Sequence, residues 1–254
     1  MIRTGTVRSQ VSPEEWQSRV DLAAAYRLVA HYHWDDLVFT HISVRIPGPE
    51  HHFLINPYGL RFDELVSSSL VKIDAEGNIV DKGHPFTVNK AGFIIHSALH
   101  MAREDAVCVW HMHTTAGMAV SGQADGLLPV HMYSHAFFER LGYHEFEGPA
   151  MRLDERKRLV KSLGKEHAMI LRNHGLLSVG STIPEAFIRF WRLNRACEVQ
   201  LAAQVAKLKL PSKKVCEASY QMNQEFLTDQ APLGELEFQA LVRKIDRQDA
   251  TYKN

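Results

Sequence analysis

The sequence predicts an α/β protein: an α/β/α layered domain with helices on both faces of a mainly antiparallel sheet. Segments in which apolar residues recur at helical spacing alternate with short β-branched runs. Tight turns such as Pro57-Tyr58-Gly59 and Glu76-Gly77-Asn78 separate the runs. The alternation lacks a regular strand–helix–strand rhythm, and frequent hairpin turns favour antiparallel pairing.

The first predicted element is a helix at residues 13–33. Ser12-Pro13-Glu14-Glu15 combines an N-cap serine, a proline at the first helical position and a glutamate three residues after the cap. Short strands are predicted after it, at residues 42–46, 52–55, 70–73 and 78–80.

The rest of the chain alternates between helix and strand. Helices are predicted at residues 91–103, 114–121, 134–141, 153–164, 183–208 and 234–246, and strands at 106–113, 145–147, 168–172 and 176–179. No repeat, linker or low-complexity stretch divides the chain, so one domain is predicted for residues 1–254. Its core covers about residues 15–208, and a helical tail at 211–254 could pack across a neighbouring molecule.

Composition excludes several classes of protein. The 254 residues are 45% hydrophobic and 23% charged, which favours a packed core over disorder. Lys plus Arg and Asp plus Glu are both 29, so a nucleic-acid binder is not indicated. The chain shows neither an apolar run of about 18 residues nor a signal segment, and its three scattered cysteines indicate no disulfide framework. We therefore expect a cytoplasmic protein that acts on a small molecule, with neither nucleic acid nor a membrane as partner.

Histidine is the outlier of the composition, with 15 residues. His111 and His113 share one face of a predicted strand because the strand period is two. His174 ends a second apolar strand, and Gly175 allows the backbone to turn directly after it. Three imidazoles around Zn²⁺ or a similar ion leave one coordination position open, as in catalytic sites. The alternative interpretation is that His111 and His113 are partly buried histidines bonded to backbone groups.

Four stretches resemble the class II aldolase and adducin head-domain family. They are Ser43-Val44-Arg45, Ile55-Asn56-Pro57-Tyr58-Gly59-Leu60, NKAGFIIHSALHMAREDAVCVWHMH at 89–113 and LRNHGLLSVG at 171–180, in matching order and spacing over residues 15–205. The resemblance implies an α/β/α sandwich, usually a homotetramer, with a divalent ion near a subunit boundary. By position it makes His111, His113 and His174 the ligands of Zn²⁺, or of another divalent ion such as Mn²⁺ or Fe²⁺.

The sequence departs from the sugar-phosphate aldolases of this family at their catalytic glutamate. Those enzymes carry the glutamate four residues before the helix histidine, where this chain has Gly92 before His96. Glycine has no side chain that could bind a metal or move a proton. The pattern Ala91-Gly92-Phe93 is closer to the adducin branch.

The phosphate-binding residues of those aldolases also differ here. The aldolases use a Gly-Asn pair, a Thr-Gly turn and a Ser-Ser pair, and this chain has instead Thr40-His41, Tyr58-Gly59 and Lys90-Ala91. A phosphate cradle needs small residues with exposed backbone donors. We therefore expect a carboxylated substrate and no turnover of fuculose- or rhamnulose-type phosphates.

Two residues are candidates for the catalytic acid–base group. His96 and His100 lie one turn apart on a predicted helix, and His96 is taken as the candidate; the alternative is a buried histidine that bonds a neighbouring strand. Tyr133, near His131, falls where the aldolases place a tyrosine proton donor. In the family that tyrosine reaches the metal from an adjacent subunit.

Four further residues are predicted to bind substrate. Arg45 could bind a carboxylate through its fork of donors, or could equally form a structural ion pair. His41 and Tyr58 are expected to line the mouth of the site, with Lys90 beside them. The remaining histidines that we assign are expected at the surface: His31, His33, His51, His52, His84, His144 and His167.

These observations favour a divalent-metal-dependent lyase of the aldolase or decarboxylase type. The ion would bind a small 2-hydroxy or 2-oxo acid through two oxygens and stabilise an enediolate, with Tyr133 or His96 supplying the proton. Both reactions share that intermediate, so the sequence does not separate them. Two alternatives fit the same residues: a noncatalytic adducin-like interaction module, and a non-haem iron oxygenase on the same histidines.

Overall fold

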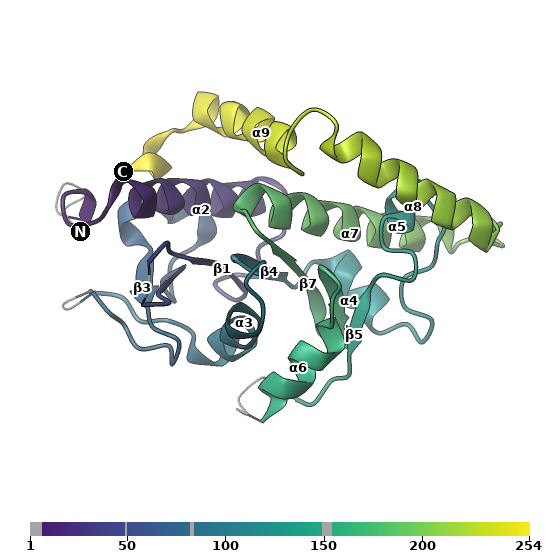
Figure 1. Ribbon diagram of the computed structural model, residues 1–254, viewed down its shortest axis with the longest axis horizontal. Helices are drawn as coiled ribbons and strands as arrows, with labels where there is room; N and C mark the ends of the chain where they lie inside the picture. Colours follow the sequence, from purple (N-terminus) through teal and green to yellow (C-terminus); the bar gives the residue numbers. More distant parts are fainter. Residues whose placement is uncertain (1–6, 49, 82–83, 149–153) are drawn as a thin grey trace.

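The computed structural model describes residues 7–48, 50–81, 84–148 and 154–254, without the side chains of Lys90, Ala91 and Leu227. Within these ranges seven strands form one sheet in the order β3-β2-β1-β4-β7-β6-β5 (Figure 1). The strands are β1 (His41–Arg45), β2 (Phe53–Ile55), β3 (Val71–Ile73), β4 (Cys108–Met112), β5 (Gly142–His144), β6 (Ala168–Leu171) and β7 (Gly175–Gly180). Neighbouring strands are antiparallel except β5 and β6, which confirms the predicted mainly antiparallel sheet.

Helices cover both faces of the sheet (Figure 1). One face is covered by α2 (Pro13–His31) and α7 (Ile183–Ala203), and the other by α3 (Lys90–Ala102) and α6 (Glu155–Leu163). The short helices α4 (Thr115–Ser121) and α5 (Met132–His135) pack against α7. The C-terminal α8 (Lys213–Thr228) and α9 (Glu235–Gln248) lie outside the layer of α2 and α7. These layers confirm the predicted fold class.

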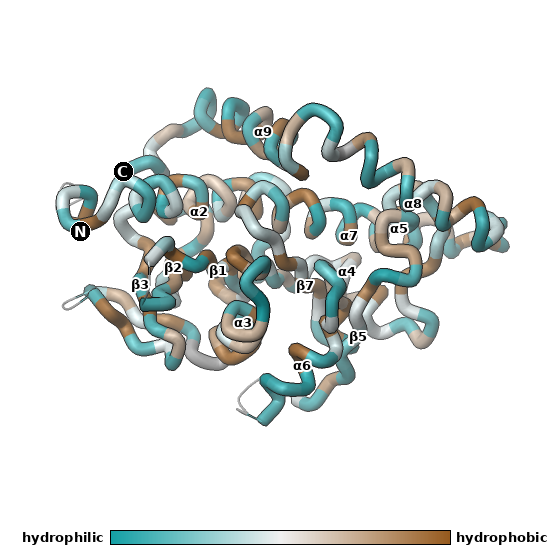
Figure 2. Tube along the Cα trace, viewed as in Figure 1, coloured by the Kyte–Doolittle hydropathy of each residue, from teal (hydrophilic) through white to brown (hydrophobic). Residues whose placement is uncertain are grey.

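The core lies between the central strands and the helices. In Figure 2, β1 and α3 carry hydrophobic colouring, whereas α6 is largely hydrophilic. Trp110 on β4 is fully buried against α7, with ring centroids 5.6 Å from Phe187 and 5.9 Å from Phe190. Val109 belongs to the apolar cluster on the opposite face, with Leu99 of α3. Because side chains alternate along a strand, the residue after Trp110 also points toward the α3 side. That residue is His111.

Most predicted boundaries agree with the structure within two or three residues, and several need correction. The strand predicted at 78–80 is a single bridge between Ile79 and Ile73. The strand predicted at 145–147 lies three residues earlier, as β5. Its first residue is glycine, a poor strand former, but a Cβ at Gly142 would lie 2.7 Å from the Ser162 carbonyl oxygen of α6. This close approach of helix and strand requires the glycine.

The helices show three further differences. The helix predicted at 134–141 is the shorter α5, and α7 ends at Ala203 and not at 208. The helix predicted at 153–164 is α6, and residue 153 lies outside the described residues. The tail contains α8, capped by Ser212, which no separate prediction covered. Its helix α9 packs on α2 and α7 of its own chain. No helix in the described ranges combines the length and the apolar character needed to cross a membrane.

Candidate metal centre

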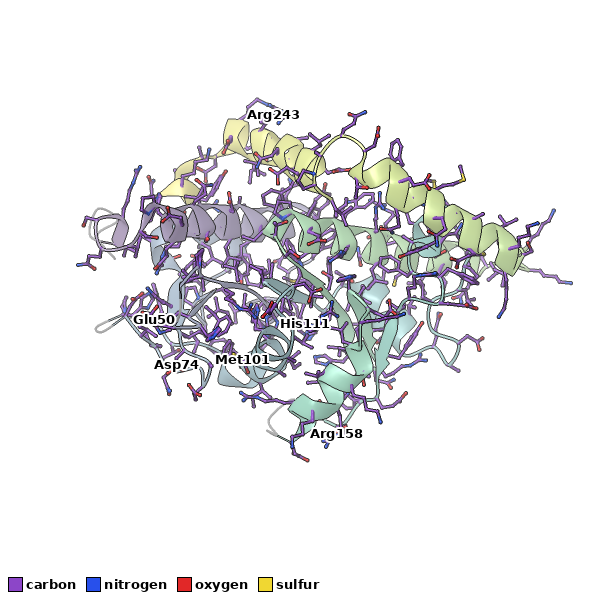
Figure 3. The ribbon with its side chains drawn as sticks, viewed as in Figure 1. Glu50, Asp74, Met101, His111, Arg158 and Arg243 are labelled. Atoms are coloured by element: carbon purple, nitrogen blue, oxygen red, sulfur yellow. The ribbon has the colours of Figure 1, made fainter. Side chains whose placement is uncertain are left out.

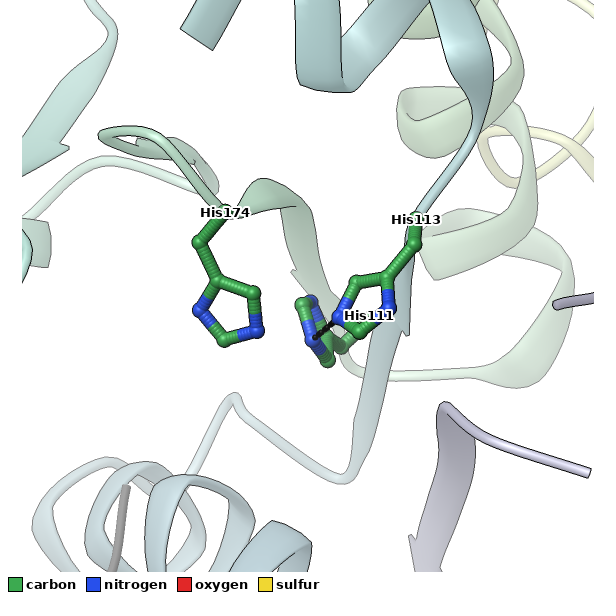
Figure 4. Close-up of side chains that lie close together, drawn as sticks. All are labelled: His111, His113 and His174. Atoms are coloured by element: carbon green, nitrogen blue, oxygen red, sulfur yellow. Dashed lines mark hydrogen bonds between the residues drawn. The ribbon is translucent and has the colours of Figure 1, made fainter. Parts of the chain in front are cut away.

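Three histidines meet at one end of the sheet. His111 belongs to β4, His113 directly follows β4, and His174 lies in the turn between β6 and β7. One ring nitrogen of each lies within 4.8 Å of those of the other two. Figure 4 shows the three rings converging, and Figure 3 places His111 in the interior whereas Arg158 and Arg243 project outward. The structure thus brings together the three histidines that the sequence predicts as ligands, and they could hold a divalent metal ion.

Strand register and one turn position these side chains. His111 is paired with His41 of β1 on one side and with Leu177 of β7 on the other. The turn that carries His174 is bonded to α4, because the His174 amide donates to Ser121 Oγ at 3.2 Å. A Cβ at Gly175 would lie 2.7 Å from the Met112 carbonyl oxygen. The glycine predicted to allow this turn therefore also allows the close approach of the two strands.

The hydrogen bonds of His111 and His113 fit a metal ion. His111 Nδ1 lies 3.0 Å from the carbonyl oxygen of Leu176, and His113 Nδ1 lies 3.0 Å from Asp36 Oδ2. Since both partners are acceptors, both Nδ1 atoms donate, and each neutral ring carries its lone pair on Nε2. The two Nε2 atoms lie 3.1 Å apart (Figure 4). Two lone pairs that face each other repel unless a proton or a metal ion lies between them, and nitrogens about 2.0–2.1 Å from one zinc ion can have this separation.

Burial keeps His111 and His174 neutral. Burial, reinforced by the neighbouring histidines, lowers the pKa of His111 well below its usual range. The same causes lower the pKa of His174 to about 4. Metal ligation requires a neutral imidazole, so these rings are in the binding form at neutral pH.

A second group of histidines lies between β1 and α3. Ser43 Oγ is 2.6 Å from His96 Nδ1 and 2.6 Å from His100 Nε2, and His100 Nδ1 is 2.6 Å from the Ala106 carbonyl oxygen. That carbonyl only accepts, so His100 Nδ1 donates, Ser43 donates to His100, and His96 Nδ1 donates to Ser43. His96 Nε2 is therefore left with a lone pair, and it is buried without a hydrogen-bond partner among the described residues. Both His96 and His100 are thus buried histidines bonded to the neighbouring strand β1, as the alternative interpretation has it.

The predicted substrate-binding residues differ in their position relative to the triad. Arg45 donates to the carbonyl oxygens of His100, Arg103 and Glu104 at the C-terminal end of α3. It lies four residues from His41 along β1, or about 13 Å at about 3.3 Å per residue. Its geometry therefore corrects the substrate-binding prediction in favour of a structural role, with hydrogen bonds in place of the expected ion pair.

The other three residues differ in position. His41 is 4% exposed, so it does not line an open mouth as predicted. Tyr58 is 41% exposed and bonded through its backbone amide to the Thr87 carbonyl. Lys90 begins α3, and its side chain lies outside what the structure describes.

Tyr133 lies on the other side of the sheet from the triad. Its ring packs edge-on against Trp191 of α7, with centroids 5.3 Å apart, and also contacts His131. His111 points to the opposite, α3 face. Among the described residues Tyr133 makes no ring contact with the triad, so a catalytic role would require a second chain.

Several residues near the triad have no clear pattern in the sequence. Asp36 and Ser121 follow no helical or strand periodicity that marks a site. His144, predicted at the surface, is 5% exposed and bonds Ser162 Oγ at 3.0 Å and Glu155 Oε1 at 3.3 Å. It shares a pocket with Glu155 and His174, lined also by Phe146, Leu171 and Arg172. The surface prediction for His144 is therefore wrong, because β5 begins earlier than expected.

Acid is expected to destabilise the fold between pH 6.5 and about 4. Burial lowers the pKa of His100 to about 3 and that of His41 to about 4, from 6.5 in the unfolded chain. Between these values the unfolded chain binds protons that the folded chain does not. The free energy of unfolding therefore has its full value above pH 6.5. Below pH 6.5 it falls with decreasing pH, by up to about 1.4 kcal/mol per pH unit for each histidine.

Urea unfolding at pH 7.5, 6 and 5, in the presence of a chelator, measures this dependence. A His33→Ala variant is the matched control, since His33 is exposed, and it should keep the slope of the parent. A free energy of unfolding that does not change between pH 7.5 and 5 would contradict the buried neutral state of these rings.

Layered helices around an antiparallel sheet, with three convergent histidines at its end, define the class II aldolase fold. The chain belongs to the family described as Class II Aldolase and Adducin N-terminal domain, whose model matches residues 20–201. The family resemblance drawn from the sequence is thus confirmed.

Solved structures and curated relatives agree with this membership. The crystal structure of an aldolase II superfamily protein from Pseudomonas syringae is 46% identical with a TM-score of 0.91, covering 98% of this chain and 99% of that one. L-fuculose 1-phosphate aldolase from Glaciozyma antarctica PI12 is 30% identical with a TM-score of 0.82, covering 95% and 93%. Alpha-adducin from Rattus norvegicus is 39% identical in an alignment 247 residues long, which covers 90% of this chain and 33% of the adducin.

Proposed function

We propose that this protein is a divalent-metal-dependent carbon–carbon lyase, of the aldolase or decarboxylase type, that acts on a small 2-hydroxy or 2-oxo acid. The observation that carries the proposal is the convergence of His111 Nε2 and His113 Nε2, 3.1 Å apart, with His174 beside them. The outer hydrogen bonds to Asp36 and Leu176 orient both rings as metal ligands are commonly oriented. Three nitrogen ligands leave room for substrate.

Each side chain has a proposed role. His111, His113 and His174 hold the ion, which is Zn²⁺ or another divalent ion such as Mn²⁺ or Fe²⁺. When bound, the ion supplies a Lewis acid that stabilises the negative charge on the substrate oxygens. His96 holds a free Nε2 lone pair, fixed by Ser43 and His100, and can accept a proton.

The proposed substrate carries a carboxylate and no phosphate. Thr40-His41 and Lys90-Ala91 replace the small donor-rich pairs of the sugar-phosphate aldolases, and His41 is turned into the interior. The metal-loaded protein should therefore consume a member of a panel of 2-hydroxy and 2-oxo acids. It should not cleave L-fuculose 1-phosphate or L-rhamnulose 1-phosphate above the rate of an enzyme-free sample.

Product analysis of both panels by chromatography tests this prediction. The His111→Ala/His113→Ala variant is the control and should be inactive on every compound. Robust cleavage of either sugar phosphate would contradict the proposed substrate class, and the Glaciozyma antarctica aldolase would then be the better guide to the substrate.

Tyr133 is the proposed proton donor, and it acts across a subunit boundary. In its own chain the Tyr133 ring lies against α7, on the side of the sheet away from His111. This position supports such an arrangement. The active form is then a homo-oligomer, a tetramer by family resemblance, in which each site combines residues of two chains.

Mixing two inactive chains tests this arrangement. A Tyr133→Phe chain mixed with a His113→Ala chain should recover part of the activity, because some interfaces then pair an intact triad with an intact tyrosine. Lack of recovery, with subunit exchange demonstrated by native mass spectrometry, would place the acid–base group within one chain, with His96 as the remaining candidate.

The likeness to alpha-adducin favours a second candidate, a noncatalytic interaction module. Position 92 is a glycine where the sugar-phosphate aldolases have their catalytic glutamate. The surrounding residues Ala91-Gly92-Phe93 are closer to the adducin branch. The two candidates differ in one observable. An interaction module shows no turnover with any divalent metal bound, whereas a lyase loses its activity when the metal is removed.

A further inference from the structure

Residue 92 lies in the first turn of α3 and faces the ring of His41. A Cβ built on Gly92 would overlap Cε1 and Nε2 of that ring and would lie 2.8 Å from Nδ1. The His41 ring therefore occupies the space of any side chain at position 92. A side chain there and the observed position of His41 exclude each other.

His41 is a buried polar side chain. It is 4% exposed, and neither Nδ1 nor Nε2 has a hydrogen-bond partner among the described residues. Burial of an unpaired polar group is costly, and such groups normally find a partner. The pairing that His41 lacks among the described residues points to a ligand from outside the chain.

The surroundings of the ring place that ligand beside the triad. The centroid of the His41 ring lies 4.2 Å from the ring centroid of His96 and 5.7 Å from that of His111. On β1 it is directly paired with His111. His41 is absent from the group whose ligand atoms lie within 4.8 Å of one another, so it adjoins the triad without being part of it.

We infer that His41 takes the place of the side chain missing at position 92 and hydrogen-bonds an oxygen of the substrate held at the triad. A neutral imidazole provides one N–H donor and one acceptor, which suits a hydroxyl or carboxylate oxygen of a 2-hydroxy or 2-oxo acid. This role rests on the proposed metal site. It differs from the role of a ligand, because removal of His41 leaves the metal in place.

Oxalate binding to the cobalt-loaded protein tests the inference without requiring turnover. Oxalate presents two adjacent carboxylates, and visible absorption of Co²⁺ reports both the metal and a bound oxalate. His41→Ala should retain about one cobalt per chain, the content expected of one site, and should bind oxalate at least tenfold more weakly than the parent. His41→Gln should recover part of the loss, since its amide donates. The exposed His51 provides the control His51→Ala, which should match the parent.

Gly92→Ala provides an independent variant that keeps His41 in the sequence. Its methyl group should displace the ring, lower the melting temperature and weaken oxalate binding as His41→Ala does. In the His41→Ala background the same methyl group has space, so its effect on the melting temperature should nearly vanish. Additive melting-temperature shifts would overturn the predicted overlap.

The outcomes separate this inference from the metal site. Unchanged oxalate affinity in His41→Ala, or loss of its cobalt to the level of the His111→Ala/His113→Ala variant, overturns the role of His41. A cobalt-loaded parent that binds no oxalate overturns it as well. A parent that takes up no cobalt instead refutes the proposed metal site.

Discussion

The His111→Ala/His113→Ala variant is expected to lose its bound divalent metal. The parent should hold about one ion per chain after dialysis against zinc, as a site of three histidines does. The double variant removes two of the three converging nitrogens. Removal of an outer hydrogen-bond partner alone weakens metal binding about 10–100-fold, so loss of two ligands should exceed that range. Elemental analysis of the dialysed proteins measures the difference.

The control for this variant is His51→Ala/His52→Ala, which changes two neighbouring histidines away from the sheet end. It should keep the metal content of the parent. If the His111→Ala/His113→Ala protein kept the full metal content, the assignment of the ligands would be wrong, whether or not the variant folds as stably as the parent.

The Trp110→Ala variant is expected to show the largest loss of stability. Trp110 is fully buried between β4 and α7, in contact with Phe187 and Phe190. Truncation of a buried tryptophan costs about 3–5 kcal/mol, and a chain of this size loses roughly 2–4 °C of melting temperature per kcal/mol. Because Trp110 precedes His111, the same variant should also loosen the metal site. Urea unfolding followed by circular dichroism measures the free energy of unfolding.

Trp110→Phe is the matched variant. It keeps most of the buried aromatic volume and removes an indole N–H that, within the described part of the chain, is buried without a hydrogen-bond partner. Its loss of free energy should therefore be clearly smaller than that of Trp110→Ala. Equal losses in the two variants would show that packing against α7 is not what Trp110 contributes.

The sequence predicts best those parts of the fold that local signals encode. The N-cap Ser12, with Pro13 in the first turn, begins α2 at the predicted residue. The alternation of β4 places His111 and His113 on one face, and Gly175 permits the turn at His174. Strand period and turn chemistry place the three histidines, and the family resemblance is what predicts them together as metal ligands.

Tertiary contacts determine what the sequence does not predict. β5 begins at a glycine because α6 packs directly on it, which no local propensity indicates. Arg45 is directed to the end of α3 by β1 and not to the substrate. His41 was expected at an open mouth, but the absence of a side chain at Gly92 allows its ring into the interior. Each of these three features depends on contacts between residues that are distant in the sequence.

Anomalous X-ray scattering from crystals of the zinc-loaded protein tests the central claim most directly. We predict one ion bonded to His111 Nε2, His113 Nε2 and a ring nitrogen of His174, at about 2.0–2.1 Å. Its remaining coordination position should face the ring of His41. An ion held by other residues, or no anomalous peak at the three histidines, would contradict the account.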